Sequence, residues 1–236
     1  MAKQHGVAGE WARVRGTVLS LWPLFLSFVL LGAFLSALLL GAALLLFGSL
    51  FVASLIAVVV YWRKGLRRVE SFFRGARGEE RVAGILAALP ETYHVFHDFV
   101  AGSEHIDHVV VGPAGVFSVE TKSWNGHVEI VEGHVLVNGA LPSRDPVAQT
   151  QREADQVKAA LKRLGFSVTV VPVICFASDT FGAGKDSCGS VKVLNSCAMV
   201  DWFAGQPESL PPNELARLVQ LMMFGSGNPK VEGRKP

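Results

Sequence analysis

Two carboxylates and one ammonium group fall on what we predict to be a single β-hairpin. Its arms are Ile106–Val111 and Val116–Thr121, and the residues Gly-Pro-Ala-Gly separate these two β-rich runs, as in a hairpin turn. Asp107 lies near the start of the first arm and Glu120 near the end of the second. Lys122 follows Glu120 by two residues, so both side chains lie on one face of the strand. Such a face could hold Mg²⁺ and a water molecule beside a phosphate group.

The register of the hairpin decides whether the two acids meet. If the turn is centred between Pro113 and Ala114, Asp107 lies directly across from Glu120, with Cβ atoms about 5 Å apart. Like charges so placed repel each other, whereas a divalent cation between them makes the pair favourable. If Gly115 instead forms a bulge, Glu120 turns to the other face. The sequence leaves both registers open, together with a third interpretation, a surface hairpin with ordinary solvated charges.

The N-terminal third of the chain is strongly apolar. No charged residue occurs between Arg15 and Arg63. A membrane helix needs about 20 apolar residues, so this run is too long for one span and fits two. We predict transmembrane helices near Val18–Leu39 and Ala42–Trp62. The alternatives are a cleaved signal peptide, whose apolar region is usually much shorter, and a buried core hairpin.

Basic residues flank this apolar run on both sides. Cytoplasmic flanks of membrane helices are enriched in Lys and Arg, so both ends are expected in the cytoplasm. We therefore expect the inner (cytoplasmic) membrane of a bacterium, with the lipid bilayer as a partner and both termini inside. Three cysteines without a CxxC pair fit a reducing compartment. The flanking cations are Lys3, Arg13, Arg15, Arg63, Lys64, Arg67 and Arg68.

Charge is unevenly distributed after the apolar run. Residues 63–78 form a basic juxtamembrane linker that suits anionic lipid, with a nucleic-acid contact as the alternative. Residues 79–236 carry a net charge of −5. Domains that bind polyanions nonspecifically are usually basic. Any nucleic acid must therefore be held locally, by a metal ion and a few cations.

Hydrophobic periodicity predicts an α/β fold in which one mixed sheet is flanked by helices, preceded by a two-helix transmembrane hairpin. The predicted domains are an N-terminal tail with two membrane helices (1–62), the linker (63–78), the soluble domain (79–224) and a disordered tail (225–236). The expected elements besides the hairpin are helices at Glu79–Leu89, Val147–Leu164 and Pro212–Phe224, strands at Tyr93–Val100, Val128–Val131, His134–Val137, Val168–Phe176 and Val191–Leu194, and a loop at Asp179–Gly189.

Several short motifs of this chain occur in the order seen in one known family. They are Gly75-x-x-Gly78-Glu79, Ile106-Asp107-His108, Gly115-Val116-Phe117, Glu120-Thr121-Lys122 and Pro146-x-x-Gln149. With them, the region from about Gly75 to Phe176 resembles the nuclease-related domain, called NERD. That family is similar to the PD-(D/E)xK restriction-endonuclease-like fold. The resemblance implies a hydrolase that uses Mg²⁺ or Mn²⁺ to cleave phosphodiester bonds in nucleic acid, usually inferred to be DNA.

The same resemblance implies roles for individual residues. Asp107 and Glu120 would be metal ligands, and Lys122 would orient the attacking water or stabilise charge on the phosphate. Glu79 would reach in from the preceding helix as a further acid, ligating metal or holding a water. Gln149 would add a polar group from the next helix. No GxGxxG, Walker lysine or GxSxG motif competes with this interpretation.

Two other functions remain open at this level. One is a catalytically silent module of the same fold that binds nucleic acid or a protein partner at the membrane. The other is an assembly scaffold, in which the transmembrane hairpin forms a homo-oligomer through small residues of the first span. These residues are Gly32, Ala33, Ser36 and Ala37.

Overall fold

The computed structural model describes residues 1–41, 44–178, 181–182 and 185–225, without the side chains of 64–68, 185 and 225. The chain divides into two compact units. One unit consists of Met1–Glu10 and Arg77–Pro236, and the other of Trp11–Ala76. The predicted tail after residue 225 lies outside the described residues.

The smaller unit is built from two helices, α1 (Glu10–Leu40) and the first part of α2 (Leu44–Leu86). Glu10–Leu40 and Leu44–Arg63 are long and apolar enough to cross a membrane, and each contains an 18-residue stretch of high mean hydropathy, 2.4 in the first and 2.6 in the second. Most of their large apolar side chains are exposed; Phe25, for example, is 72% exposed. The Tyr61 hydroxyl donates to the Leu19 carbonyl oxygen across the helix pair at 2.7 Å. These two helices support the predicted association with a membrane.

Helix α2 is longer than the sequence pattern indicated. We predicted a linker over residues 63–78 and a helix that begins at Glu79 and ends at Leu89. In the structure α2 is continuous from Leu44 and ends at Leu86. Residues 63–78 lack proline and contain five helix-forming arginines, so their three glycines do not interrupt the helix.

The larger unit contains a seven-stranded mixed sheet with the order β1-β2-β3-β4-β7-β9-β8. β1 with β2, β4 with β7, and β7 with β9 pair in parallel, and the other neighbours are antiparallel. This confirms the predicted α/β fold with one mixed sheet. The strands are β1 (Lys3–His5), β2 (His94–Ala101), β3 (Glu104–Gly112), β4 (Gly115–Lys122), β7 (Val170–Phe176), β8 (Lys185–Cys188) and β9 (Val191–Asn195), with β5 (Val128–Val131) and β6 (His134–Val137) as a separate hairpin.

Both edge strands were missed by the sequence analysis. β1 lies in a segment that we had assigned to a tail, and β8 lies in the predicted loop Asp179–Gly189. Neither has a run of branched apolar residues, and each is a strand because it pairs with a neighbour: Lys3 with His94, and Cys188 with Val191. The short helix α4 (Met199–Ala204) was missed for a similar reason, since six residues carry little periodicity.

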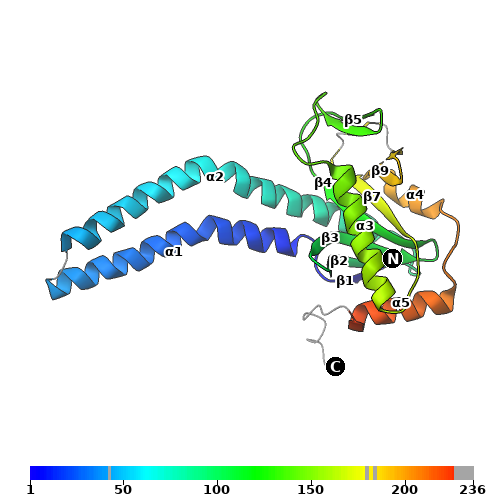
Figure 1. Cartoon of the computed structure of the whole chain (residues 1–236), viewed down its shortest axis with the longest axis horizontal. Helices are drawn as coiled ribbons and strands as arrows, with labels where there is room; N and C mark the ends of the chain where they lie inside the picture. Colours follow the sequence, from blue (N-terminus) through cyan, green and yellow to red (C-terminus); the bar gives the residue numbers. More distant parts are fainter. Residues whose placement is uncertain (42–43, 179–180, 183–184, 226–236) are drawn as a thin grey trace. The chain divides into compact units, whose positions relative to one another are not determined.

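Helices cover both faces of the sheet (Figure 1). On one face, α3 (Pro146–Arg163) and α5 (Pro212–Gly225) bury residues such as Val157 and Leu218 against Val109 and Val116. On the other face, the end of α2 and helix α4 bury residues such as Leu86 and Phe203 against Val110, Phe117 and Val119. Because alternate residues of a strand point to opposite faces, Glu120 belongs, like Val116, to the α3 face.

Gly78 allows α2 to approach the C-terminal end of β4 closely. A Cβ atom at Gly78 would lie within 1.7 Å of Ser123 Oγ and 3.0 Å of Ser123 Cβ. Rotation of the serine hydroxyl relieves only the first contact. The glycine therefore fixes how near Glu79, the next residue of α2, comes to Lys122.

We predict that Gly78→Ala lowers the free energy of unfolding by about 1–3 kcal/mol, the cost of overpacking. Gly84→Ala is the matched control, because no atom lies within 4 Å of a Cβ on Gly84 in the same helix. That control should gain up to about 1 kcal/mol from helix propensity. Thermal unfolding of the full chain in detergent, followed by circular dichroism, measures both. Equal stability of the two variants would contradict the close approach.

Candidate functional site

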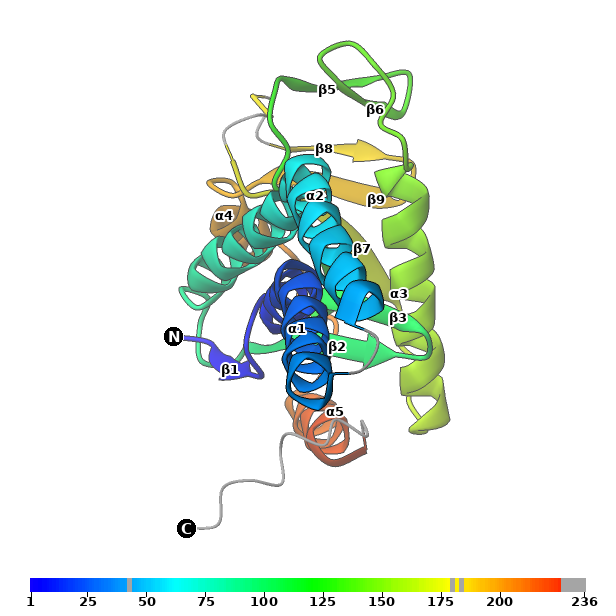
Figure 2. The ribbon, with the colours of Figure 1, turned by 90° about the vertical axis from the view of Figure 1, so that its left-hand side faces the viewer.

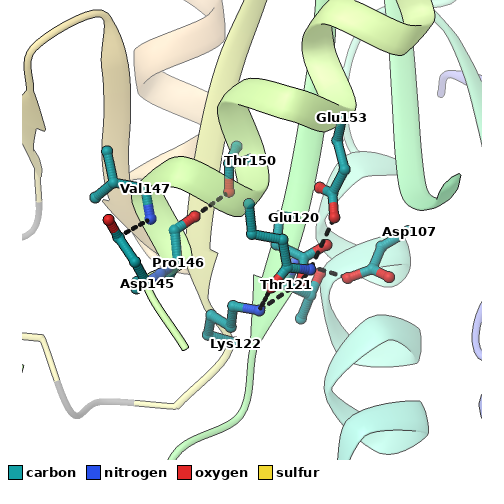
Figure 3. Close-up of polar contacts among 10 residues, drawn as sticks. Asp107, Glu120, Thr121, Lys122, Asp145, Pro146, Val147, Thr150 and Glu153 are labelled. Atoms are coloured by element: carbon teal, nitrogen blue, oxygen red, sulfur yellow. Dashed lines mark hydrogen bonds and ion pairs between the residues drawn. The ribbon is translucent and has the colours of Figure 1, made fainter. Parts of the chain in front are cut away.

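Asp107 and Glu120 face each other across β3 and β4. The two strands pair Gly112 with Gly115 and His108 with Val119, which is the register that places Asp107 opposite Glu120. The bulged alternative is therefore wrong. Regular pairing stops at His108, and one Asp107 carboxylate oxygen instead accepts a hydrogen bond from the Thr121 backbone N–H at 2.7 Å. This bond holds the acid at the end of the hairpin (Figure 3).

Gln149 joins Lys122 and Glu120 from helix α3. Its Oε1 accepts a hydrogen bond from Lys122 Nζ at 3.0 Å, and its Nε2 donates to Glu120 Oε1 at 2.8 Å. Lys122 also forms an ion pair with Glu120, at 2.5 Å. An amide can satisfy an ammonium and a carboxylate at once because it presents an acceptor and two donor hydrogens. Gln149 therefore fixes both charged side chains relative to each other.

The start of helix α3, one turn before Gln149, is fixed by a proline and a side-chain cap. It begins at Pro146, and the Asp145 side chain caps it by accepting from the backbone N–H groups of Val147 and Ala148 at 2.9 and 3.3 Å. Proline at the first position and an aspartate cap are the expected start of a helix. The cap lies one turn before Gln149, so it fixes the position of the Gln149 backbone.

Glu153 is a further acid of the site that the sequence analysis missed. Its Oε1 accepts the second Gln149 Nε2 hydrogen at 2.8 Å, and its side chain is 1% exposed. Its Oε2 is buried without a hydrogen-bond partner among the described residues. The signal in the sequence was its spacing, since residues four apart lie on the same helix face. Figure 3 shows Glu153 pointing toward Glu120 from the helix above the strands.

Glu79 enters from α2, the helix on the opposite face of the sheet. Its pKa is raised to about 7, first by burial and then by repulsion from Asp98 and Glu120. The Gly9 backbone and Lys122 partly offset this rise. The structure therefore brings all five predicted residues, Glu79, Asp107, Glu120, Lys122 and Gln149, to the same end of the sheet.

Acidic side chains outnumber basic ones at this site. The pKa of Asp107 is raised well above its ordinary value by burial and by repulsion from Glu120 and Glu79. The pKa of Glu153 is raised to about 9, again by burial first and by Glu120 second. Burial alone would lower the pKa of Lys122, yet Glu120, Asp107 and Glu153 together raise it. Four carboxyl groups thus share one ammonium group in surroundings with little water.

This donor set suits a hard divalent cation. Carboxylate oxygens are preferred by Mg²⁺ and Mn²⁺, and an added positive charge would relieve the repulsion among the acids. Within the described part of the chain, no three His, Cys, Asp or Glu side chains are arranged to hold a metal ion by themselves. Mg²⁺ does not require three, because it is usually held by one or two carboxylates and keeps several waters. Asp107 and Glu120 fit that requirement.

His108, part of the motif around Asp107, lies on the other face of the sheet. Its Nδ1 is 2.8 Å from Nδ1 of His97, and His97 Nε2 is 2.6 Å from the amide oxygen of Gln4 in β1. Burial lowers the pKa of both histidines. These neutral rings connect β1, β2 and β3 beneath the site and do not join the carboxylates.

Comparison with known proteins identifies the region that holds this site. Residues 74–177 match the family model of the nuclease-related domain, NERD. The match runs from the end of α2 to just after β7, and it includes all five predicted residues and Glu153. The resemblance expected from the short motifs is thereby confirmed, and this segment is related to nucleases.

Other comparisons reach less of the chain. An uncharacterized protein of Bacillus anthracis is 33% identical over 85 residues, which cover 34% of this chain and 40% of that protein. The chain therefore spans less than half the length of this curated relative. No solved structure matches the chain.

The raised pKa of Glu153 predicts how stability depends on pH. The folded protein keeps this proton up to about pH 9, whereas the unfolded chain releases it near 4.5. Folding is therefore favoured most below the lower value and loses up to about 1.4 kcal/mol per pH unit as pH rises toward the upper one. We predict that Glu153→Gln reduces this loss between pH 6 and pH 9.

Denaturant unfolding of the full chain in detergent, with a chelator present, measures this slope. Asp155→Asn is the control, because it removes an exposed acid from the same helix and should keep the wild-type slope. A Glu153→Gln protein whose stability falls as steeply as that of the wild type would contradict the assignment.

Proposed function

We propose that this chain is a metal-dependent nuclease held at a membrane, which hydrolyses phosphodiester bonds in nucleic acid and has DNA as its substrate. The observation that carries the proposal is the convergence of Asp107, Glu120 and Lys122 at the end of the β3–β4 hairpin, where Gln149 joins Glu120 to Lys122 and Thr121 holds Asp107. The match of residues 74–177 to a nuclease-related domain supports the same class of reaction.

Each residue of the site would have a separate role in catalysis. Asp107 and Glu120 would hold Mg²⁺ or Mn²⁺, with Glu79 as a further acid beside them. The metal supplies Lewis acidity toward the phosphate and lowers the pKa of a bound water. Lys122, fixed by Glu120 and Gln149, directs its ammonium group toward the place where negative charge develops on the phosphate. Glu153 keeps the Gln149 amide turned so that its oxygen faces Lys122.

We predict that the full chain in detergent cleaves single- or double-stranded DNA when Mg²⁺ or Mn²⁺ is added, and that a chelator abolishes cleavage. Asp107→Ala, Glu120→Ala and Lys122→Ala should each reduce the rate at least about 100-fold, the usual effect of removing an electrostatic group. Glu91→Ala, which removes an exposed acid outside the site, is the control and should cleave like the wild type. RNA of the same sequence tests the choice of substrate.

Equal cleavage by the wild type and all three site variants would overturn the proposal. Binding of DNA without cleavage under any metal condition would favour the alternative, a catalytically silent module.

The pairing of β1 with β2 supports the placement of both termini on the same side of the membrane. β1 forms hydrogen bonds with β2 of the soluble domain, so the N-terminus and this domain lie on the same side of any membrane. The two apolar helical segments lie between them in the sequence, and two crossings return the chain to its starting side. The basic flanks favour the cytoplasmic side of a bacterial inner membrane.

We predict that a fluorescent protein fused to either terminus is fluorescent in a bacterial host. Alkaline phosphatase, which is active only outside the cytoplasm, should be active when fused after Gly41 and inactive when fused at either end. An active phosphatase at the N-terminus would contradict both the even number of crossings and the pairing of β1 in the cell.

A further inference from the structure

Helix α3 carries an exposed face that is rich in cations and leads away from the site. Of the thirteen Lys and Arg residues in the sequence after residue 78, four lie on this one helix. All four are exposed: Arg152, Lys158, Lys162 and Arg163. In a segment whose net charge is −5, this concentration of positive charge is local.

These cations are not neutralised by neighbouring acids. None of the four forms an ion pair within the described residues. The single exposed acid of the helix, Asp155, accepts a hydrogen bond from the Gln151 side chain at 3.4 Å. Figure 2 shows α3 along one side of the sheet with no other element beyond it. The cationic face is therefore open to a partner.

The periodicity of the helix places this face next to the site. Arg152 and Arg163 are eleven residues apart, about three turns, so they lie on the same side of α3 about 16 Å from each other. Arg152 is less than one turn from Gln149, the α3 residue that holds Lys122 and Glu120. A line of positive charge thus begins at the site and continues along the helix.

We propose that this face of α3 is a phosphate-binding track that holds the nucleic acid strand on one side of the cleavage site. The inference rests on the proposed function and names how its polymeric substrate is bound. A separation of about 16 Å corresponds to about five nucleotides along one strand of a duplex. The track explains how an acidic domain would bind a polyanion: four exposed cations lie on one helix, and a metal ion at Asp107 and Glu120 would neutralise the scissile phosphate.

The test uses the full chain in nanodiscs of phosphatidylcholine, whose neutral headgroups do not compete for the cations. Binding of a fluorescein-labelled 20-nucleotide DNA, single-stranded and as a duplex, is measured by anisotropy between 50 and 200 mM salt with a chelator present. The variant Arg152→Gln/Arg163→Gln removes two charges, and glutamine preserves helix propensity. The control Lys3→Gln/Lys192→Gln removes two charges from strands β1 and β9.

A plot of log K against log salt has a negative slope. We expect this slope to be shallower in the α3 variant, by about 1.8 for duplex DNA or 1.4 for a single strand. At 0.1 M salt this amounts to about 60-fold or 25-fold weaker binding. The control should bind like the wild type. An unchanged slope in the α3 variant, or an equal loss in the control, would overturn the track.

A second measurement separates the failure of the track from the failure of the nuclease. Cleavage of the 20-nucleotide DNA is compared with cleavage of the small diester thymidine 5′-(4-nitrophenyl phosphate), both with Mn²⁺. The α3 variant should lose at least tenfold more activity on the polymer than on the small diester. Equal losses of activity on both substrates would contradict the phosphate-binding track but not the nuclease proposal. If neither substrate is cleaved while the α3 variant still binds DNA more weakly, the result would support the track and contradict the nuclease proposal.

Discussion

An excess of acidic side chains with little access to water is the constraint around which this end of the sheet is organised. Glu79, Asp107, Glu120 and Glu153 converge on one ammonium group, and burial with mutual repulsion raises the pKa values of Glu79, Asp107 and Glu153. Such an arrangement costs folding free energy, because carboxylates are poorly solvated there. Proteins retain unfavourable polar clusters chiefly where chemistry requires them, and a divalent cation is the simplest group that would reverse this cost.

The surrounding fold is built to hold that cluster rigidly. The β3–β4 hairpin sets the spacing of Asp107 and Glu120, and the capped start of α3 holds the Gln149 amide, which connects Lys122 with Glu120 and Glu153. Gly78 lets α2 come close enough to β4 for Glu79 to take part. The hairpin and one helix from each face of the sheet therefore meet at one end of the sheet.

Outside the acidic cluster, positive charge is concentrated on one exposed helix face. The soluble domain is acidic as a whole, yet the outer face of α3 is basic and open. A surface of this kind attracts phosphate without making the whole protein adhere to nucleic acid. Placing it on the helix that also carries Gln149 couples substrate binding to the position of Lys122, because both depend on the same rigid helix.

The sequence by itself determined the local features. The long uncharged run, the hairpin and the helix of Gln149 follow from composition, turn residues and periodicity, which act between residues close in the chain. The register of the hairpin, which the sequence left open, is decided by the observed pairing of β3 with β4. Only the tertiary structure decided the rest. β1 becomes a strand because β2 offers it a partner 91 residues away, and Glu153 joins the site because α3 packs over β4. The raised pKa values likewise come from burial by distant segments, which no local pattern records.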